Sequence, residues 1–294
     1  MMATIVLAGC GESSKQRRLR LEAERAKLAA EEQSALKIAV TPTLDCLPLF
    51  LLKDSVLYDT TKVDVRLYRY NAHMDSDTAL IRNHVDGMTT DLVRVEHLRR
   101  TGHPMATVSA TEAHWQLLAN KRSRLKELKQ LSDRIVAMTR FSATDLLTDR
   151  ALKNGKPKYQ AYKVQINDVN IRLQMLRNNE IDALWLMEPY ATAARLTGAN
   201  VLMDSRKDSI NLGALAFRVD VMADDKRYEQ ITELLKAYDK AVDHINRNGL
   251  QAYADIIKKY MPVDEKTIKA LPAVRFKHSQ EPMPKDIATA ASLK

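Results

Sequence analysis

The chain has 294 residues with a formal net charge of +9, and 45% of its residues are hydrophobic. This composition is sufficient for one large domain or for two domains with sizeable cores. Its two cysteines exclude a disulfide scaffold and a four-cysteine zinc site. No stretch approaches the ~20 consecutive apolar residues of a membrane-spanning helix. Basic residues alternate with acidic ones, as in 121–129 and 229–240, so we interpret the excess charge as solvated surface and expect no nucleic-acid partner.

The first ten residues, MMATIVLAGC, end in a short motif with chemical meaning. Leu7–Cys10 resembles a bacterial lipobox, in which the chain is cut before the cysteine and the thiol carries a lipid. No basic segment precedes it, which an upstream start codon would explain; the alternative is a frayed N-terminus. We predict a signal remnant over 1–10 with lipidation at Cys10. A charged tether over 11–35 follows, because its thin apolar stripe favours an exposed helix.

From Leu36 onward, short runs rich in β-branched residues alternate with helical patterns. The strands that we expect lie at 36–40, 63–68, 85–88, 105–108, 134–138, 162–166, 181–186, 201–203 and 212–219. The helices that we expect lie at 47–57, 76–83, 91–100, 146–152, 169–176, after 188–190, and from 225 to Gly249. The segment 122–131 reads as a charged helix or a connector. The tail with Pro272, Pro282 and Pro284 reads as irregular.

Several polar residues stand where helices are expected to begin. Ser142 precedes the helical pattern at 146–152, Asp168 precedes the one at 169–176, and Asp75 or Ser76 stands at the start of the one at 76–83. Repeated strand–helix alternation predicts mostly parallel sheets covered on both faces. Ligands of such sheets bind beyond the carboxyl ends of the strands, where helix N-termini expose free N–H groups.

Four stretches in a fixed order carry a resemblance to a known family. They are 37–40 with Pro48-Leu49, the turn 85–91, the strand–turn–helix unit 134–152, and the stretch 178–190 that ends in Glu-Pro-Tyr. Together they resemble the type II periplasmic solute-binding proteins of ABC importers. The similarity is to the branch that serves sulfonates, taurine, nitrate and thiamine-precursor pyrimidines.

The resemblance implies a two-lobed α/β fold, in which each lobe has a mostly parallel sheet flanked by helices and two crossover strands join the lobes. Lobe one would comprise 36–120 and 215–294, and lobe two 121–214. The lobes would close around a ligand by a hinge motion. The implied function is that of a monomeric substrate-binding lipoprotein, held at the cell envelope by its lipid and facing the periplasm or the exterior. Its partners would be a small ligand and the importer's permease, without a metal or cofactor.

The resemblance and the strand-end rule point to the same candidate ligand residues. They are Thr41, Thr43, Asp45, Met74, Asp75, Ser76, Thr89, Thr90 and Asp91 in lobe one, and Arg140, Ser142, Thr144, Asn167, Asp168, Glu188 and Tyr190 in lobe two. The serines and Asp168 would equally serve as helix caps only, and Trp185 reads as core. Arg140 would pair with an acidic ligand, whereas the acids favour an amine or a pyrimidine. The ligand class therefore stays open between a sulfonate, an amine and a pyrimidine.

An enzyme is the main alternative function, because some relatives of this fold make a thiamine pyrimidine with a cysteine-rich motif. That motif is absent, the seven histidines are scattered, and no serine nucleophile elbow is visible. A ligand-sensing effector domain is the third class, but no helix-turn-helix unit stands at either end. We therefore predict ligand binding without catalysis.

Overall fold

The computed structural model describes residues 14–293, and the chain divides into two compact units, 1–35 and 36–294. The predicted signal remnant and Cys10 lie outside the described residues. In the first unit, α1 spans Ser14–Ser34 and has no buried residue. Arg18 and Glu22 pair one turn apart on its surface, which supports an isolated helix by a few tenths of a kcal/mol. The charged segment is therefore helical where it is described, and its role as a tether stays a prediction.

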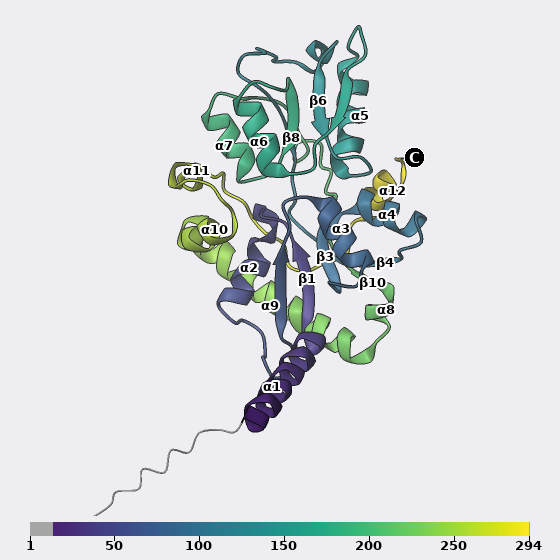
Figure 1. Ribbon diagram of the computed structural model, residues 1–294. Coiled ribbons are helices and arrows are strands. Elements are labelled where there is room, and N and C mark those ends of the chain that lie inside the picture. The colour runs from purple at the N-terminus through teal and green to yellow at the C-terminus, as the bar shows by residue number, and fades with distance from the viewer. Residues whose placement is uncertain (1–13, 294) are drawn as a thin grey trace, which may run out of the picture. The chain divides into compact units, whose positions relative to one another are not determined.

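The second unit contains all the strands of the described chain (Figure 1). The strands are β1 (Leu36–Val40), β2 (Val65–Arg69), β3 (Gly87–Asp91), β4 (Met105–Ala110), β5 (Gln116–Ala119), β6 (Ile135–Met138), β7 (Tyr162–Gln165), β8 (Ala183–Leu186), β9 (Asn200–Asp204) and β10 (Gly213–Arg218). The helices are α2 (Leu47–Asp54), α3 (His73–Ile81), α4 (Leu92–Arg100), α5 (Ala143–Gly155), α6 (Val169–Arg177), α7 (Tyr190–Leu196), α8 (Val219–Met222), α9 (Asp225–Asn248), α10 (Ala254–Tyr260), α11 (Glu265–Lys269) and α12 (Pro284–Ala291). No helix within 14–293 combines the length and apolarity that crossing a membrane requires.

The strands form two five-stranded sheets with the same design. The first has the order β2-β1-β3-β10-β4 and the second β7-β6-β8-β5-β9. In each sheet one strand, β10 or β5, runs antiparallel to both neighbours, while the remaining pairs are parallel. The expected pair of mostly parallel sheets is thus confirmed.

The two antiparallel strands are also the two crossovers of the chain. The chain leaves the first sheet after β4 and enters the second as β5, and it returns after β9 as β10. The connecting segments are 111–115 and 205–212. We expected β5 in lobe one and the first residues of β10 in lobe two, but their ladders place β5 in the second sheet and all of β10 in the first. These boundaries were misplaced because no pattern marked the short strand β5.

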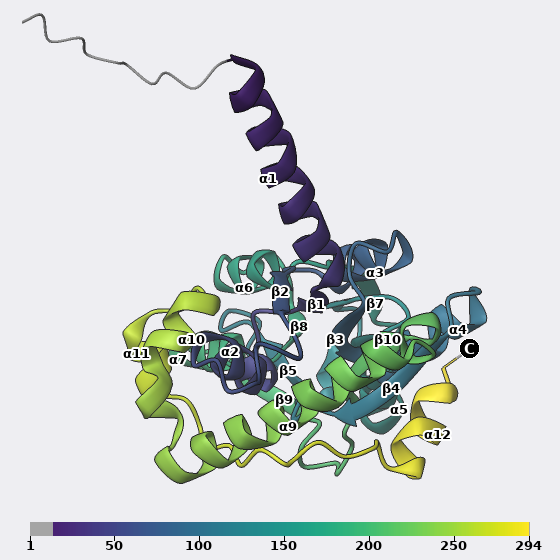
Figure 2. The same cartoon turned by 90° about the horizontal axis from the view of Figure 1, so that it is seen from below.

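Successive side chains of β1 point to opposite faces of the first sheet, and both faces are buried. Leu36, Ile38 and Val40 pack with α2 and α9 in one cluster, whereas Ala39 packs with residues of α3 and α4 in another. Figure 2 shows α9 extending along this side of the sheet. The apolar face expected from residue 225 onward is the buried face of α9, whose first turn is capped by the Asp224 side chain.

The second sheet is covered in the same way. Trp185 and Met138 pack with the buried face of α5, while Leu184 and Ala137 pack on the opposite face with residues of α6 and α7. Successive residues of β6 and β8 therefore face opposite helices, as period-two alternation requires. Burial on both faces explains why these strands read as continuous apolar runs.

Two local expectations were wrong. Ser76 does not cap the third helix: α3 begins three residues earlier at His73, after Ala72, and Ser76 is buried within it. The tail is not wholly irregular, because Pro284 occupies the first turn of α12, where its missing N–H costs nothing. The segment 122–131 is mainly a connector and contains only a short 3-10 turn at Leu128–Leu131.

Candidate functional site

A small enclosed cavity lies where the carboxyl ends of both sheets meet. Its volume is about 40 Å³. Its walls are Thr41, Thr43, Asn71, His73 and Asp91 from the first sheet's side, Trp115 from a connector, and Thr139, Ser142, Thr144, Asn167, Val169, Arg172, Trp185, Leu186 and Met187 from the second sheet's side. We call it the cleft cavity. About 10–15 Å³ of such volume holds one water, so it has room for roughly three waters. A larger ligand therefore requires the lobes to separate further.

Contacts between the lobes enclose this cavity. The backbone N–H of Leu44 donates to the carbonyl of Glu188 at 2.8 Å, and the N–H of Val169 donates to the carbonyl of Asn71 at 3.3 Å. On the side of α4, the rings of His97 and Phe141 stack with their centroids 4.3 Å apart. The structure is thus a closed arrangement of the lobes.

Asp91 joins the two lobes directly. This buried residue ends β3 and caps α4, where its Oδ1 accepts the N–H of Arg94 at 3.0 Å. The same oxygen accepts the N–H of Ala143, the first residue of α5, at 2.9 Å. One carboxylate therefore occupies the N-termini of a helix from each lobe, where negative charge is favoured. Burial nevertheless dominates and raises the pKa of Asp91 to about 7.

Arg172 places a positive charge at the opposite wall. It lies on the buried face of α6 and is 6% exposed. Its guanidinium donates to the carbonyl of Ile166 at 2.6 Å, to the carbonyl of Trp185 at 3.2 Å, and to the hydroxyl of Thr139. None of the described carboxylates forms an ion pair with it. Burial lowers its pKa to about 10, so it remains charged at neutral pH.

A guanidinium has five N–H groups, and these bonds use three of them. One N–H on each terminal nitrogen therefore has no acceptor among the described residues. A buried cation lacking a counter-charge is costly unless something else compensates it. The wall at Arg172 is therefore suited to an anionic or strongly accepting group of a ligand.

His73 contributes a neutral imidazole between two arginines. This partly buried side chain opens α3, and its buried Nδ1 has no hydrogen-bond partner among the described residues. Burial and the positive charges of Arg94 and Arg172 lower its pKa to about 3. Of these two arginines, Arg94 is already paired with an acid, because it forms a buried ion pair with Asp77. At neutral pH the His73 ring thus offers one donor or one acceptor without adding charge.

The remaining walls combine hydroxyls and aromatic rings. Thr41 and Thr43 join their hydroxyls at 2.8 Å, and both lie close to the buried thiol of Cys46. The pKa of this thiol is raised to about 12, mainly by burial, so the thiol stays protonated and unreactive. Trp185 is fully buried and donates its indole N–H to Thr148 at 2.8 Å, as a core residue does, yet its ring also forms part of the cavity wall.

Some of the predicted ligand residues do meet at one cavity. Those that line it are Thr41, Thr43, Asp91, Ser142, Thr144 and Asn167. Ser142 also caps α5, so its hydroxyl serves the helix as well as the wall. Their contact with a ligand remains a prediction.

The other predicted residues lie outside the cavity walls, each for a local reason. Arg140 is exposed, and only its carbonyl is used, by Arg94. Glu188 forms an ion pair with Arg195 at 2.9 Å and accepts the N–H of Thr192. Asp168 caps α6. The rest are Asp45, Ser76, Thr89, Thr90 and Tyr190, which are buried elsewhere, and Met74 and Asp75, which are exposed on α3.

Sequence reasoning missed the most polar part of the site. Asn71, His73 and Arg172 line the cavity but were not among the predicted ligand residues. Asn71 and His73 follow β2 and could have been found by the strand-end rule that selected Met74. Arg172 has no such signal, because an arginine one turn into a polar-looking helix reads as solvated surface.

Comparison with known proteins agrees with this architecture. No protein-family profile matches the sequence, and no curated protein matches it either. Among solved structures, the alkanesulfonate-binding protein SsuA of Xanthomonas axonopodis bound to MOPS superposes with a TM-score of 0.71 at 16% identity, over 88% of this chain and 91% of that one. The aliphatic sulphonate binding protein SsuA of Escherichia coli gives 0.68 at 18% identity, over 88% and 86%.

The nitrate-binding protein NrtA of Synechocystis gives a TM-score of 0.69 at 15% identity, over 80% of this chain and 68% of that one. The chain has the periplasmic binding protein fold. These three neighbours are named as sulfonate- and nitrate-binding proteins, ligand classes of the branch that the sequence resembles. At these identities the likeness establishes the fold and leaves ligand and partner to the site itself.

Proposed function

We propose that this chain is the solute-binding component of an ABC-type importer and holds a small solute in the cleft cavity by hinge closure. The observation that carries the proposal is the cavity itself, which is enclosed by strand-end side chains of both sheets. A ligand in that position contacts both lobes only when they are closed, so binding stabilises the closed form. Such a two-state element is what a transporter requires in order to distinguish loaded from empty protein.

The charges of the cavity favour a ligand that carries an anionic group. Arg172 supplies a buried cation with unused N–H groups, while the oxygen of Asp91 is already engaged by two backbone N–H groups. Hydroxyls of Thr41, Thr43 and Thr144 add neutral donors. Among the classes considered, a sulfonate or another small oxyanion therefore fits better than a simple amine. The ring of Trp185 provides an apolar wall for its organic part.

The location at the cell envelope is proposed on the sequence motif at Cys10. One or two acyl chains on this thiol would hold the protein at a membrane, and the helical segment α1 would separate the lipid from the second unit. Mass spectrometry of protein expressed with its complete leader tests this directly. Acylation at Cys10 adds the mass of its lipid to the mature N-terminus, and an unmodified Cys10 would contradict the anchor without affecting the cleft.

Native mass spectrometry of freshly purified protein tests the binding function. A co-purified small molecule names the ligand, and its affinity is then measured by titration with the chemically pure compound. Chemical conversion of that molecule by the protein would overturn binding without turnover and favour an enzyme.

A pair of asparagine variants locates the site. Asn167 lines the cavity just before α6, whereas Asn170 lies in the first turn of α6 and outside the cavity walls. Asn167→Ala is expected to weaken ligand binding at least tenfold while the melting temperature of the empty protein changes by less than about 2 °C. Asn170→Ala is the matched control and should bind normally. Equal ligand affinity of both variants would show that the ligand does not bind in this cavity.

A further inference from the structure

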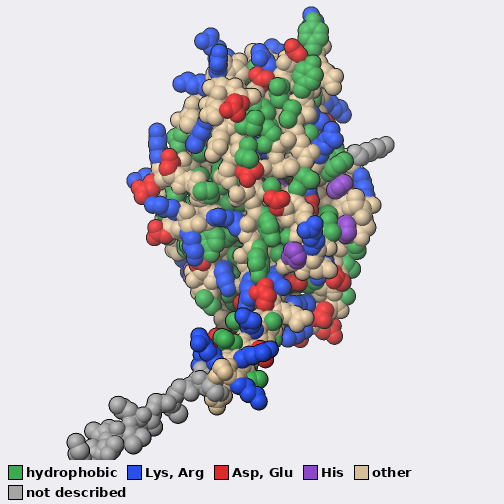
Figure 3. Space-filling view, viewed as in Figure 1, with side chains coloured by type: hydrophobic (Ala, Val, Ile, Leu, Met, Phe, Trp, Pro, Cys, Tyr) green, Lys and Arg blue, Asp and Glu red, His purple; other side chains and the backbone are tan. Residues whose placement is uncertain are grey.

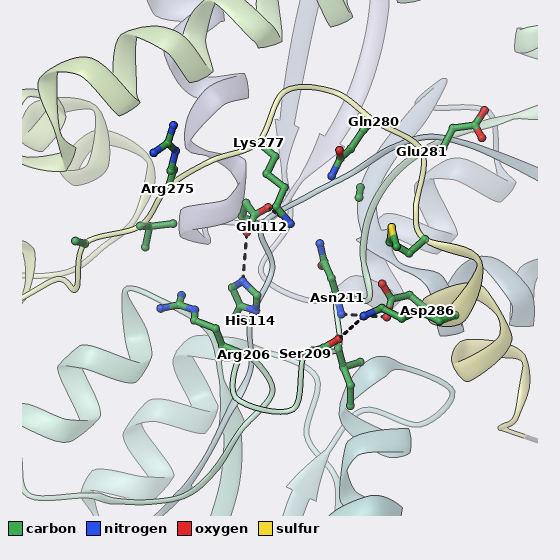
Figure 4. A pocket seen from close by; sticks show the side chains of 16 residues that line it. Glu112, His114, Arg206, Ser209, Asn211, Arg275, Lys277, Gln280, Glu281 and Asp286 are labelled. Atoms are coloured by element: carbon green, nitrogen blue, oxygen red, sulfur yellow. Dashed lines mark hydrogen bonds and ion pairs between the residues drawn. The ribbon is translucent and has the colours of Figure 1, made fainter.

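A second and larger cavity lies at the hinge. Its volume is about 470 Å³, within the range of ligand-binding sites. It is formed by the two connecting segments 111–115 and 205–212 together with the C-terminal segment 273–286, as Figure 4 shows. It shares no lining residue with the cleft cavity. We call it the hinge cavity.

Two acidic groups of the hinge cavity already have partners. Glu112 pairs with Lys277 at 3.6 Å and lies 3.4 Å from Nε2 of His114. Asp286 accepts the backbone N–H of Asn211 at 3.4 Å. The charge of Glu112 is therefore compensated by Lys277.

Two arginines of the hinge cavity are uncompensated. Arg206 belongs to the second connecting segment and Arg275 to the C-terminal segment, and both lie on the same side of the cavity (Figure 4). Neither guanidinium forms a hydrogen bond or ion pair with any described residue. Glu281 lies on the opposite side of the cavity, and its carboxylate forms no hydrogen bond or ion pair with the described residues. Each guanidinium can therefore donate charge-assisted hydrogen bonds to an anion held in the cavity.

The cavity also offers a histidine side chain. His114 belongs to the first connecting segment, 111–115, and its buried Nδ1 has no hydrogen-bond partner among the described residues. Figure 4 shows its ring between Glu112 and Arg206. A buried ring nitrogen without a partner loses free energy that a ligand donor or acceptor can restore.

We propose that the hinge cavity binds a metabolite-sized anion, carrying phosphate or carboxylate groups, through Arg206 and Arg275, and that the bound anion alters the opening of the lobes. The connecting segments are the parts of the chain whose backbone must change when the lobes move. The C-terminal segment is fixed to the first sheet, because Ala110 donates its N–H to the carbonyl of Gln280 at 2.7 Å. An anion held between Arg206 and Arg275 therefore links a moving segment to a fixed one. Its affinity differs between open and closed forms, which by linkage changes the affinity of the cleft.

Binding is tested on the full chain with citrate and inorganic phosphate as probes, by calorimetric titration. We expect saturable binding of at least one probe and an affinity at least tenfold lower in the double variant R206A/R275A. The control K207A/K269A removes two exposed cations outside the cavity and should bind as the wild type does. Both arginines are exposed, so melting temperatures should confirm that every variant is folded. Absence of saturable binding, or an equal loss in the control, would overturn the site.

The coupling rests on the proposed hinge motion and is measured without any cleft ligand. Fluorophores on Lys158→Cys in lobe two and Lys226→Cys in lobe one, in a Cys10→Ser background, report the interlobe distance by energy transfer. The probe anion is expected to shift the transfer efficiency in the wild type and not in R206A/R275A. Binding without a shift would overturn the coupling. Failure of the cleft proposal would appear separately, as normal solute binding by Asn167→Ala.

Discussion

Replacing the carboxyl group of Asp91 tests whether its raised pKa makes the stability of the protein depend on pH. The pKa of this group rises from 3.8 to about 7 because it is buried. Such a group stabilises the folded state fully below pH 3.8, and this contribution is lost as the pH rises toward 7. At about 1.4 kcal/mol per tenfold change in proton affinity, the loss amounts to roughly 4 kcal/mol. Asp91→Asn keeps an acceptor for the N–H groups of Arg94 and Ala143 but removes the titration.

His73 has the opposite pH dependence in the same cavity. Its pKa falls from 6.5 to about 3, so its contribution to stability is present above pH 6.5 and is lost as the pH falls toward 3. The size is similar, roughly 5 kcal/mol. Between pH 4 and 6.5 the effects of Asp91 and His73 on the free energy of unfolding therefore offset each other. The wild type should show little net slope from this pair, and each single variant should reveal the other's slope.

Urea unfolding at half-unit intervals from pH 4.5 to 8 measures both slopes. Relative to the wild type, Asp91→Asn should gain stability steadily as the pH rises to 7, whereas His73→Gln should gain stability as the pH falls below 6.5, because it lacks the histidine whose contribution the wild type loses there. The exposed and uncharged Thr78 on α3 supplies the control, and Thr78→Ala should run parallel to the wild type. Curves for Asp91→Asn and wild type that stay parallel throughout would refute the assignment of a raised pKa to this buried carboxyl.

Three further substitutions test packing within the lobes, each by urea unfolding. Tyr190→Phe should leave stability unchanged or raise it by up to about 1 kcal/mol, because the buried hydroxyl has no partner among the described residues; a loss above 1 kcal/mol would show a missed hydrogen bond. Glu188→Ala should lower stability by about 2–3 kcal/mol, since it leaves Arg195 without its acid; an unchanged free energy of unfolding would show that this ion pair does not stabilise the fold. Gly87→Ala should cost about 1–3 kcal/mol, because its Cβ would lie 2.4 Å from the ring of Phe217, and a neutral result would mean that the ring moves freely.

Local pattern was sufficient for the elements that are periodic and bounded. The apolar face of α9 and the capping residues Ser142 and Asp168 could be predicted because they depend on neighbours within four residues. The strand β5 was missed because it has only four residues and follows the connector without a turn signal. The start of α3 was misplaced because Ser76 satisfied the composition of a cap without its geometry.

The candidate site was predictable only where it obeys the strand-end rule. Thr41, Thr43, Asp91 and Asn167 follow strands that can be recognised one at a time. The sequence could not indicate that Asp91 accepts an N–H of Ala143, fifty-two positions away and in the other lobe. Nor could it separate Arg140, which points to solvent, from Arg172, which is buried at the cavity.

By itself, the sequence determined that the chain alternates strands and helices, where most of them begin, and which strand ends carry polar groups. These features follow from side-chain periodicity and from capping, which act over a few residues. Only the tertiary structure decided which polar groups share a cavity and which charges are left without partners. That outcome depends on burial and on contacts between segments far apart in the chain, because burial removes the water that would otherwise compensate each charge.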